Sequence, residues 1–443
     1  MCIRDRHWTV QKEAGIDYIP CNDFSFYDTV LDTAVLLGIV PKRYQELNLS
    51  ALDTYFAMAR GYQGESGDVK ALAMKKWFNT NYHYIVPEAE DDTKIALVGE
   101  KLWEEYEEAK ALGIETKPVL TGPYTLLKLC RYTGSKTADD FTDAVIAAYQ
   151  QVLEKCAAHR IMWLQLDEPA LVRDLSKEDI ALFHKIYENI LPCKKTVRIL
   201  LQTYFGDVRD IYKDLTELPF DGIGLDFIEG KETVHLIEKY GFPKDKLLFA
   251  GLVNGKNIWR NHYDRTLNQL QQLTGKGIQT VLSTSCSLLH VPYTVKHETK
   301  LSEKYLDYFA FAEEKLSELK ELSGFAENPS YTQESAYKKN SALFAADRDC
   351  KNAAVKKRLS EVTEKDYVRL PKRSERQQLQ KETFHLPQFP TTTIGSFPQT
   401  KDVKQNRAAF RKGEITEQEY TAFNKKKIAE CIKKQEEIGL DVL

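Results

Sequence analysis

Asp167 and Glu168 are the sharpest candidates for chemistry in this sequence, because two carboxylates stand together where an apolar run ends. The run is "IMWLQLDEPAL", and Pro169 follows the pair directly, so we expect a buried strand to stop there. Carboxylates at a strand end can bind a substrate amine or move protons. They can equally cap the next helix or brace the rim of the fold. Position alone leaves both interpretations open.

Cys286, His290 and Asp226 have the chemistry of metal ligands. Zinc needs three or four nitrogen, sulfur or oxygen ligands that converge in space. Cys286 and His290 belong to one predicted strand end, and Asp226 ends a neighbouring predicted strand. The strand end "LLQTYF" offers neither His nor Cys, so the set is incomplete. We therefore favour a structural role for these residues and predict no metal site among them.

The stretch "KKWFNTNYHYIVPE" at 75–88 concentrates aromatic rings beside two lysines. Its rings are Trp77, Phe78, Tyr82, His83 and Tyr84, and its lysines are Lys75 and Lys76. Aromatic faces next to lysines suit a flat heterocycle that carries carboxylates. An aromatic plug over the mouth of the fold would have the same composition, and composition favours the plug. Neither a GxSxG elbow nor a phosphate-binding P-loop is present in the sequence.

Seven short apolar runs must position these residues, and longer amphipathic stretches separate them. The runs lie at 15–20, 117–123, 161–171, 196–205, 222–227, 246–255 and 277–290. Nearly continuous apolar runs indicate strands buried on both faces, hence a parallel sheet. Alternation of strand and helix predicts an α/β fold of the TIM (β/α)8 class, in which function gathers at the carboxyl ends of the strands. The other polar residues expected at those ends are Asp23, Thr203, Tyr204, Asn254 and Ser285.

The composition of the chain changes after about residue 325, where charged residues and glutamine become frequent and apolar runs become rare. We expect residues 1–325 to form an N-terminal barrel that lacks its first strand, and 326–388 to form a charged, partly helical linker closed by "LPQFP". We expect 389–443 to begin a second barrel, with "TTTIGSFPQT" (391–400) as its opening strand.

An internal repeat supports this division. "QKEAGIDYI" from Gln11 and "QEEIGLDVL" from Gln435 match at Gln, Glu, Gly and Asp with a constant offset. In the second copy "TIGSFP" precedes this joint. The first copy would therefore place its opening strand before residue 1, and the second would need further residues after Leu443. The prediction is a two-barrel architecture truncated at both ends.

Composition limits the possible classes of function. The 443 residues carry a formal net charge of −3, which provides no strong field for nucleic acid or membranes. No apolar run approaches the length of a membrane span, and the charged start "MCIRDRHW" does not resemble a signal peptide. The eight cysteines are scattered without a CxxC pair, which is typical of reduced thiols. We expect a cytoplasmic protein.

Taken together, the longer motifs resemble the cobalamin-independent methionine synthase family. These motifs are "HWTVQKEAGID", "KWFNTNYHYIVPE", "LQLDEPAL", "GLVNGKNIWR", "STSCSLLH" and "TTTIGSFPQT", and they span nearly the whole chain. The resemblance implies two face-to-face barrels and methyl transfer from 5-methyltetrahydropteroyltriglutamate to L-homocysteine, giving L-methionine without cobalamin. It also implies a zinc ion that activates the homocysteine thiolate, small-molecule substrates only, and a monomeric intact enzyme.

The resemblance assigns site residues one at a time. Lys76 is similar to the family's contact to the folate tail, and Ile394, Gly395 and Ser396 are similar to part of its homocysteine/methionine site. The family's zinc ligands and its proton-donating His belong to the second barrel and are expected beyond Leu443, and its short basic folate-binding segment before residue 1. Cys286 and Asp226 hold the first-barrel places equivalent to two of the zinc ligands.

The resemblance therefore predicts no catalytic residue within this chain, and a chain inactive on its own. The alternative, from a different class, is a non-catalytic folate-binding or regulatory barrel.

Overall fold

The computed structural model describes residues 2–346 and 352–443, and the chain divides into two compact units. The first unit runs to Ala346 and the second to Leu443. The predicted boundaries near 325 and 388 stay predictions. Cys350, one of the cysteines expected to be reduced, lies outside the described residues, and the other seven are free thiols.

A seven-stranded parallel sheet organises the first unit, with strand order β1-β7-β9-β10-β11-β12-β13. Its strands are β1 (Pro20–Cys21), β7 (Lys117–Thr121), β9 (Trp163–Asp167), β10 (Arg198–Gln202), β11 (Gly222–Asp226), β12 (Leu247–Val253) and β13 (Thr280–Thr284). Each falls in or beside one of the seven predicted runs. The α/β class with TIM-type strand–helix alternation is confirmed, and β1 and β13 are the two edge strands of this sheet.

β1 is shorter than the run at 15–20 suggested. Gly15 ends the preceding helix in the left-handed region at φ 75°, and regular pairing begins only at Pro20. Pro20 has no N–H to donate, and β1 pairs with β7 alone, so the ladder stays two residues long.

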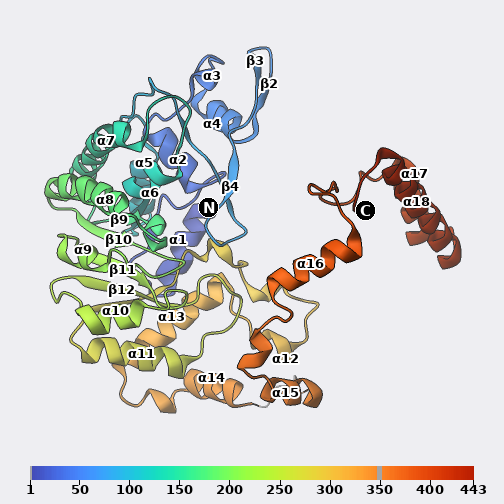
Figure 1. Ribbon diagram of the computed structural model, residues 1–443. Helices are drawn as coiled ribbons and strands as arrows, with labels where there is room; N and C mark the ends of the chain where they lie inside the picture. The colour runs from blue at the N-terminus through green and yellow to red at the C-terminus, as the bar shows by residue number, and fades with distance from the viewer. Residues whose placement is uncertain (1, 347–351) are drawn as a thin grey trace. The chain divides into compact units, whose positions relative to one another are not determined.

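Helices follow most strands, and α7 to α11 lie along one side of the sheet (Figure 1). The α-helices of the first unit are α1 (Ile3–Glu13), α2 (Thr29–Leu36), α3 (Lys42–Gln45), α4 (Ala51–Arg60), α5 (Lys101–Ala111), α6 (Pro123–Leu129), α7 (Ala138–Ala158), α8 (Lys177–Ile190), α9 (Tyr212–Glu217), α10 (Thr233–Tyr240), α11 (Tyr263–Gly275), α12 (Glu303–Leu306), α13 (Ala312–Glu327) and α14 (Ser335–Ala345). Short 3-10 turns include η1 (Pro169–Val172), directly after β9. The strands supply a continuous apolar core, in which Leu164, Leu166 and Leu201 are fully buried.

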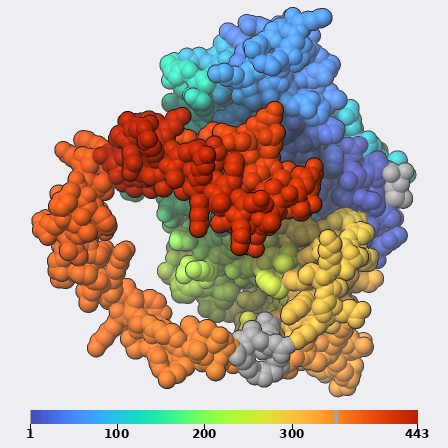
Figure 2. All heavy atoms as spheres, turned by 90° about the vertical axis from the view of Figure 1, so that its right-hand side faces the viewer, coloured from blue at the N-terminus to red at the C-terminus, as the bar shows by residue number. Residues whose placement is uncertain are grey.

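A long insertion separates β1 from β7. It holds two hairpins, β2 (Tyr62–Gly64) with β3 (Gly67–Val69) and β4 (Met74–Lys76) with β5 (His83–Ile85). A further small pair joins β6 (Glu88–Ala89) to β8 (Arg131–Tyr132). Helices α3 and α4 and the β2–β3 hairpin lie together at one end of the first unit in both views (Figures 1 and 2).

The second unit is helical. It contains α15 (Ala353–Ser360), η6 (Glu364–Tyr367), α16 (Arg373–Phe384), α17 (Lys401–Arg411) and α18 (Glu417–Ile438). α18 starts with a capping box, in which Thr416 and Glu419 satisfy each other's backbone N–H groups, and it ends at the left-handed Gly439.

The expectation that 391–400 forms a strand is wrong for this structure, because that segment has no regular secondary structure. A strand needs a neighbour that accepts and donates a ladder of hydrogen bonds. Here only Thr391 is bonded to the end of the chain, through Asp441 and Val442.

Candidate functional site

Asp167 lies at the end of β9, and a chain of polar side chains leads to it across the sheet. The buried Lys117 amine on β7 donates to Gln165. Gln165 Nε2 donates to Asp167 Oδ1 at 2.6 Å, and the Tyr204 hydroxyl donates to Asp167 Oδ2 at 3.1 Å. Burial raises the pKa of Asp167 to about 6 and lowers that of Lys117 to about 8. Asp167 can therefore exchange a proton near neutral pH.

Glu168 has a structural role. Its side chain is fully buried, and it accepts from the backbone N–H groups of Tyr124 (3.0 Å) and Thr125 (2.7 Å) at the start of α6. The Tyr187 hydroxyl donates to it at 2.5 Å. Gly122 is required beside it, because a Cβ there would lie 2.2 Å from Glu168 Cδ. Capping of the next helix, the interpretation left open from the sequence, is not what the structure shows: Glu168 binds the start of α6, which precedes β9, while Asp167 faces the strand-end network.

The residues considered as metal ligands are committed to other contacts. Asp226 Oδ1 accepts from the backbone N–H groups of Ile228 (2.7 Å) and Glu229 (2.9 Å), and Oδ2 accepts from that of Phe205 (2.9 Å). Both carboxylate oxygens of Asp226 are therefore already occupied by backbone donors. Burial raises the pKa of the Cys286 thiol to about 12, and burial lowers that of His290 to about 4.

Three more of the predicted strand-end residues bind the backbone. The Thr203 hydroxyl donates to the carbonyl of Gly224 at 2.8 Å, and Ser285 Oγ accepts from the N–H of Gly255 at 3.1 Å. Asn254 Oδ1 accepts from the N–H of Lys256 at 2.9 Å, which shapes the turn after β12. These residues fix the loops in which other side chains are displayed.

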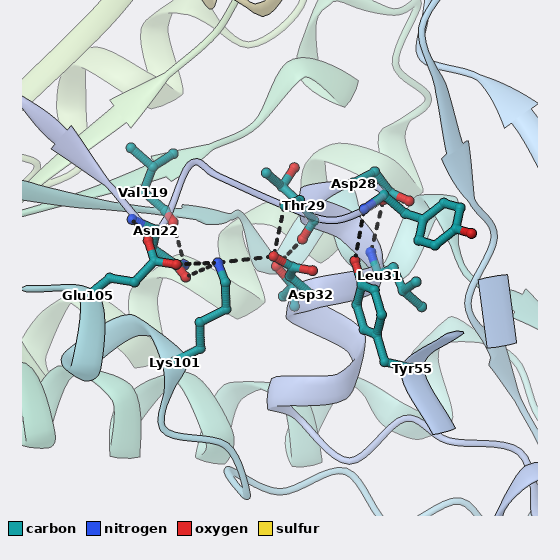
Figure 3. Close-up of polar contacts among 12 residues, drawn as sticks. Asn22, Asp28, Thr29, Leu31, Asp32, Tyr55, Lys101, Glu105 and Val119 are labelled. Atoms are coloured by element: carbon teal, nitrogen blue, oxygen red, sulfur yellow. Dashed lines mark hydrogen bonds and ion pairs between the residues drawn. The ribbon is translucent and has the colours of Figure 1, made fainter. Parts of the chain in front are cut away.

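The end of β1 carries an ionic cluster that the sequence did not suggest (Figure 3). Lys101, at the start of α5, donates to Asn22 Oδ1 at 2.9 Å and pairs with Asp32 (3.0 Å) and Glu105 (3.2 Å). Glu105 in turn accepts from the N–H of Asn22, which lies in the left-handed region at φ 59°. The cluster ties α2 and α5 to the strand end, and Asp23 follows it with an exposed side chain.

The aromatic stretch forms the β4–β5 hairpin and turns most of its rings inward. Trp77 and Tyr84 are buried, and the Tyr82 hydroxyl donates to the carbonyl of Tyr27. Lys75 and Lys76 stay exposed on β4, where Lys76 pairs with His83 across the hairpin. The plug interpretation therefore fits the rings, while the lysines remain open to solvent.

Ile394, Gly395 and Ser396 belong to the second unit and are exposed. The Gly395 carbonyl accepts from the Thr393 hydroxyl at 3.2 Å, which closes a local turn. These residues therefore belong to an exposed stretch without regular secondary structure.

Sequence reasoning missed Lys117 and Gln165, which bring Asp167 into the strand-end network. A lysine at the first position of a run otherwise as apolar as "KPVLTGP" was an available signal, because a strand of a parallel sheet is buried on both faces. The pairing of Lys117 with Gln165 depends on the register of β7 against β9, which the sequence does not display.

The fold and the strand-end arrangement define the first unit as a (β/α) barrel module of the TIM class. The family model described as "Cobalamin-independent synthase, N-terminal domain" matches residues 1–277, and "Cobalamin-independent synthase, Catalytic domain" matches residues 389–443. The chain belongs to the cobalamin-independent synthase family, which confirms the resemblance seen in its motifs.

Two relatives named 5-methyltetrahydropteroyltriglutamate–homocysteine methyltransferase illustrate the similarity. Those of Campylobacter jejuni subsp. doylei and Streptococcus suis are each 54% identical over 100% of this chain. The chain spans 58% of the length of these curated relatives. A solved B12-independent methionine synthase from Shewanella sp. W3-18-1 is 14% identical, with a TM-score of 0.49 over 73% of this chain and 85% of that one.

Within residues 2–346 and 352–443, no group of three or more His, Cys, Asp or Glu side chains is placed to hold a metal ion. Over the same residues, no helix has both the length and the apolar character needed to cross a membrane.

Proposed function

We propose that this chain is part of an enzyme that transfers a methyl group from 5-methyltetrahydropteroyltriglutamate to L-homocysteine, giving L-methionine. The observation that carries the proposal is the 54% identity, along the whole chain, to relatives named for that reaction. In the reaction an S–CH3 bond forms as the N–CH3 bond breaks, and the leaving nitrogen takes a proton. A cytoplasmic location and a monomeric intact enzyme belong to the same proposal.

A chimera tests this function directly. Residues 1–443 replace the equivalent 58% of the Campylobacter jejuni relative, and the purified chimera receives both substrates. We expect methionine to form at a rate within about tenfold of that relative's, because a 54% identical module preserves its core and loops. A folded chimera without activity would contradict the proposal and favour a non-catalytic, folate-binding or regulatory barrel. We expect the 443-residue chain alone to make no methionine.

Lys76 is the proposed contact for the glutamate tail of the folate. Support comes from its exposed amine on β4 and from the basic residue beside it, which together suit an anionic tail. In the chimera, Lys76→Gln should raise KM for the triglutamate substrate about tenfold and leave kcat nearly unchanged, because binding to a remote carboxylate is lost uniformly.

Lys75→Gln is the matched control. Lys75 is equally exposed and next in sequence, but side chains of adjacent strand residues point to opposite faces, and it pairs with Tyr84 where Lys76 pairs with His83. Equal effects of the two substitutions on KM would contradict a specific role for Lys76.

Ile394, Gly395 and Ser396 are proposed to hold the amino-acid head of homocysteine or methionine, with the Ser396 hydroxyl as the polar contact. Their exposure within the second unit is compatible with a surface that meets a ligand. In the chimera, Ser396→Ala should raise KM for homocysteine several-fold, with Ser374→Ala, also exposed, as the control.

Zinc is the cofactor that this proposal includes, and cobalamin is excluded from it by the family's description. The described residues provide no fitting set of ligands, so we expect the ligands to lie outside them. Metal analysis of the purified chain should find less than about 0.1 zinc per molecule at chelator concentrations that spare a structural four-ligand site.

A further inference from the structure

Two bulky residues of the first unit hold unusual backbone conformations and meet each other. Phe78 (φ 50°) and Phe205 (φ 73°) both lie in the left-handed region, which residues with a Cβ rarely adopt. Their ring centroids are 6.0 Å apart. Such conformations cost about 1–3 kcal/mol each and persist only where surrounding contacts enforce them, commonly at ligand sites.

Polar anchors on neighbouring strand ends enforce both conformations. Asp226 accepts from the backbone N–H of Phe205 at 2.9 Å. Asn79, next to Phe78, donates to Glu229 at 2.6 Å and accepts from Lys256 at 2.8 Å, and Lys256 pairs with Glu229 at 2.5 Å. The hairpin loop is therefore fixed to the loops that follow β11 and β12.

The two rings line a pocket of about 330 Å³ together with Asn79, Val172 and Arg173. Phe205 follows β10, Val172 ends η1 after β9, and Arg173 comes next, so the pocket lies at the carboxyl ends of the strands. That is the end at which barrels of this class bind ligands. Its volume is at the lower end of the range for small-molecule pockets.

Arg173 is the only charged residue among these five. Its guanidinium carbon lies 4.7 Å from the centroid of the Phe78 ring, so the planar group rests on the ring face. Within the part of the chain that the structure describes, this guanidinium has no hydrogen-bond or ion-pair partner. The nearby Glu229 carboxylate is already neutralised by Lys256. The pocket thus offers a positive group with free donors above an apolar, aromatic wall.

We propose that this pocket binds a small carboxylate with a flat or apolar body, with Arg173 recognising the carboxylate and Phe78 and Phe205 contacting the body. A planar guanidinium held on a ring has its donors oriented for the two oxygens of a carboxylate. The ligand can be a free aromatic acid or the glutamyl end of a larger aromatic compound, because both join a carboxylate to a ring. The inference stands on residues of the first unit and does not require that the chain takes part in methyl transfer.

Ligand-observed fluorine NMR on the full 443-residue chain tests the proposal. The probes are 4-fluorobenzoate, N-(4-fluorobenzoyl)-L-glutamate and the uncharged 4-fluorobenzamide. We expect at least one carboxylate probe to bind about tenfold or more tightly than the amide, because only a carboxylate uses the free guanidinium. Whichever carboxylate binds more tightly identifies the source of the ligand.

Arg173→Gln should weaken binding of that probe about tenfold or more. Arg60→Gln is the matched control, because Arg60 is also exposed and also rests on a phenylalanine ring, with 4.8 Å to the centroid of Phe56, outside this pocket. Binding to Arg60→Gln should stay within about twofold of the unsubstituted chain.

Phe205→Gly provides a second, independent variant. Glycine accepts the left-handed backbone while the ring is removed, so it should weaken the carboxylate and amide probes alike. Circular dichroism checks that each variant is folded. Equal binding by the unsubstituted chain and Arg173→Gln, or no binding of either carboxylate at millimolar concentration, would overturn the proposal.

Discussion

The end of β9 in the first unit and the segment 391–400 in the second were both expected to be strand ends that carry site residues. Only the end of β9 is part of a sheet. At β9 the strand is paired on both sides, and Glu168 is 0% exposed with three hydrogen-bond donors around it. In the second unit Ile394 is fully exposed, and the segment is bonded to other parts of the chain near its two ends, by Thr391 with Asp441 and by Gln399 with Arg407 of α17. Polar residues at a strand end become a defined arrangement only when neighbouring strands fix the backbone that carries them.

Removing Glu168, at the end of β9, should have the largest effect on the free energy of unfolding of the first unit. Glu168→Ala leaves two backbone N–H groups and the Tyr187 hydroxyl buried without an acceptor, and it opens a cavity. We expect the first unit to lose about 3–5 kcal/mol of unfolding free energy.

Urea unfolding followed by tryptophan fluorescence measures this loss, because the chain's five tryptophans all belong to the first unit. They are Trp8, Trp77, Trp103, Trp163 and Trp259. Ser396→Ala, in the exposed segment, should leave the same transition unchanged. A loss below about 1 kcal/mol for Glu168→Ala would mean that the hydrogen bonds around Glu168 do not stabilise the fold more than those of an exposed segment such as 391–400.

The two units should also respond to pH in opposite directions. In the first unit, burial raises the pKa of Glu318 to about 7, and its Oε2 has no partner among the described residues. The folded state therefore keeps a proton that the unfolded state has lost, so stability is greatest below the ordinary pKa of 4.5 and falls as pH rises through about 7. Glu318→Gln should remove about 2 kcal/mol of this pH dependence between pH 5 and pH 8.

In the second unit, hydrogen bonds lower the pKa of surface carboxylates instead. The Thr400 hydroxyl and then Lys427 hold that of Asp402 at about 2. Its contribution is present above the ordinary value and lost as pH falls toward 2. Hydrogen exchange at α17 and α18 should therefore quicken as pH falls from about 4 toward 2, whereas the stability that Glu318 contributes to the first unit is gained at higher pH, as pH falls from about 7 to 4.5. If acidification changed the stability of both units in the same direction, the expected difference between them would be contradicted.

Phe205 offers a smaller test of how strongly a paired sheet can hold an unfavourable backbone. Phe205→Ala and Phe205→Gly both lose the buried ring, but only glycine is relaxed at φ 73°. We therefore expect the glycine variant to be more stable than the alanine variant by about 1 kcal/mol, measured by urea unfolding. The reverse order would show that the left-handed conformation is not maintained in solution.

Substitution of Asp441 should have the smallest effect, and that effect should be confined to the exposed segment 391–400. Its carboxylate accepts from the N–H of Thr391 at 2.7 Å and from that residue's hydroxyl at 2.8 Å. Asp441→Ala should speed hydrogen exchange at Thr391 and leave the tryptophan transition of the first unit unchanged. If exchange at Thr391 does not change, this contact does not order the segment.

The sequence was most informative where burial on both faces left a continuous apolar run. Runs such as "GIGLDF" and "KLLFAGLVNG" gave the strands of the sheet, because only a central parallel strand needs both faces apolar. The run at 391–400 was wrongly predicted to be a strand, because a strand-like sequence does not indicate whether a neighbouring strand is available to pair with it.

The site was less accessible to sequence reasoning for a different reason. The role of Glu168 depends on Tyr187, a helix away, and that of Phe205 depends on a backbone angle that nothing in "LLQTYF" encodes. The first requires tertiary packing and the second requires the anchor at Asp226. Residue type therefore identified the candidates, and contacts between distant segments decided what each one does.

The attachment of Asn79 to Lys256 also has a consequence for the order of folding. These residues are 177 positions apart in the chain, so their contact closes a very long loop. The entropy of that closure can be compensated only after β11 and β12 have paired and placed their loops. We therefore expect the tip of the hairpin at Asn79 to dock late, after the body of the hairpin has bonded to the nearby Tyr27 and Asp28.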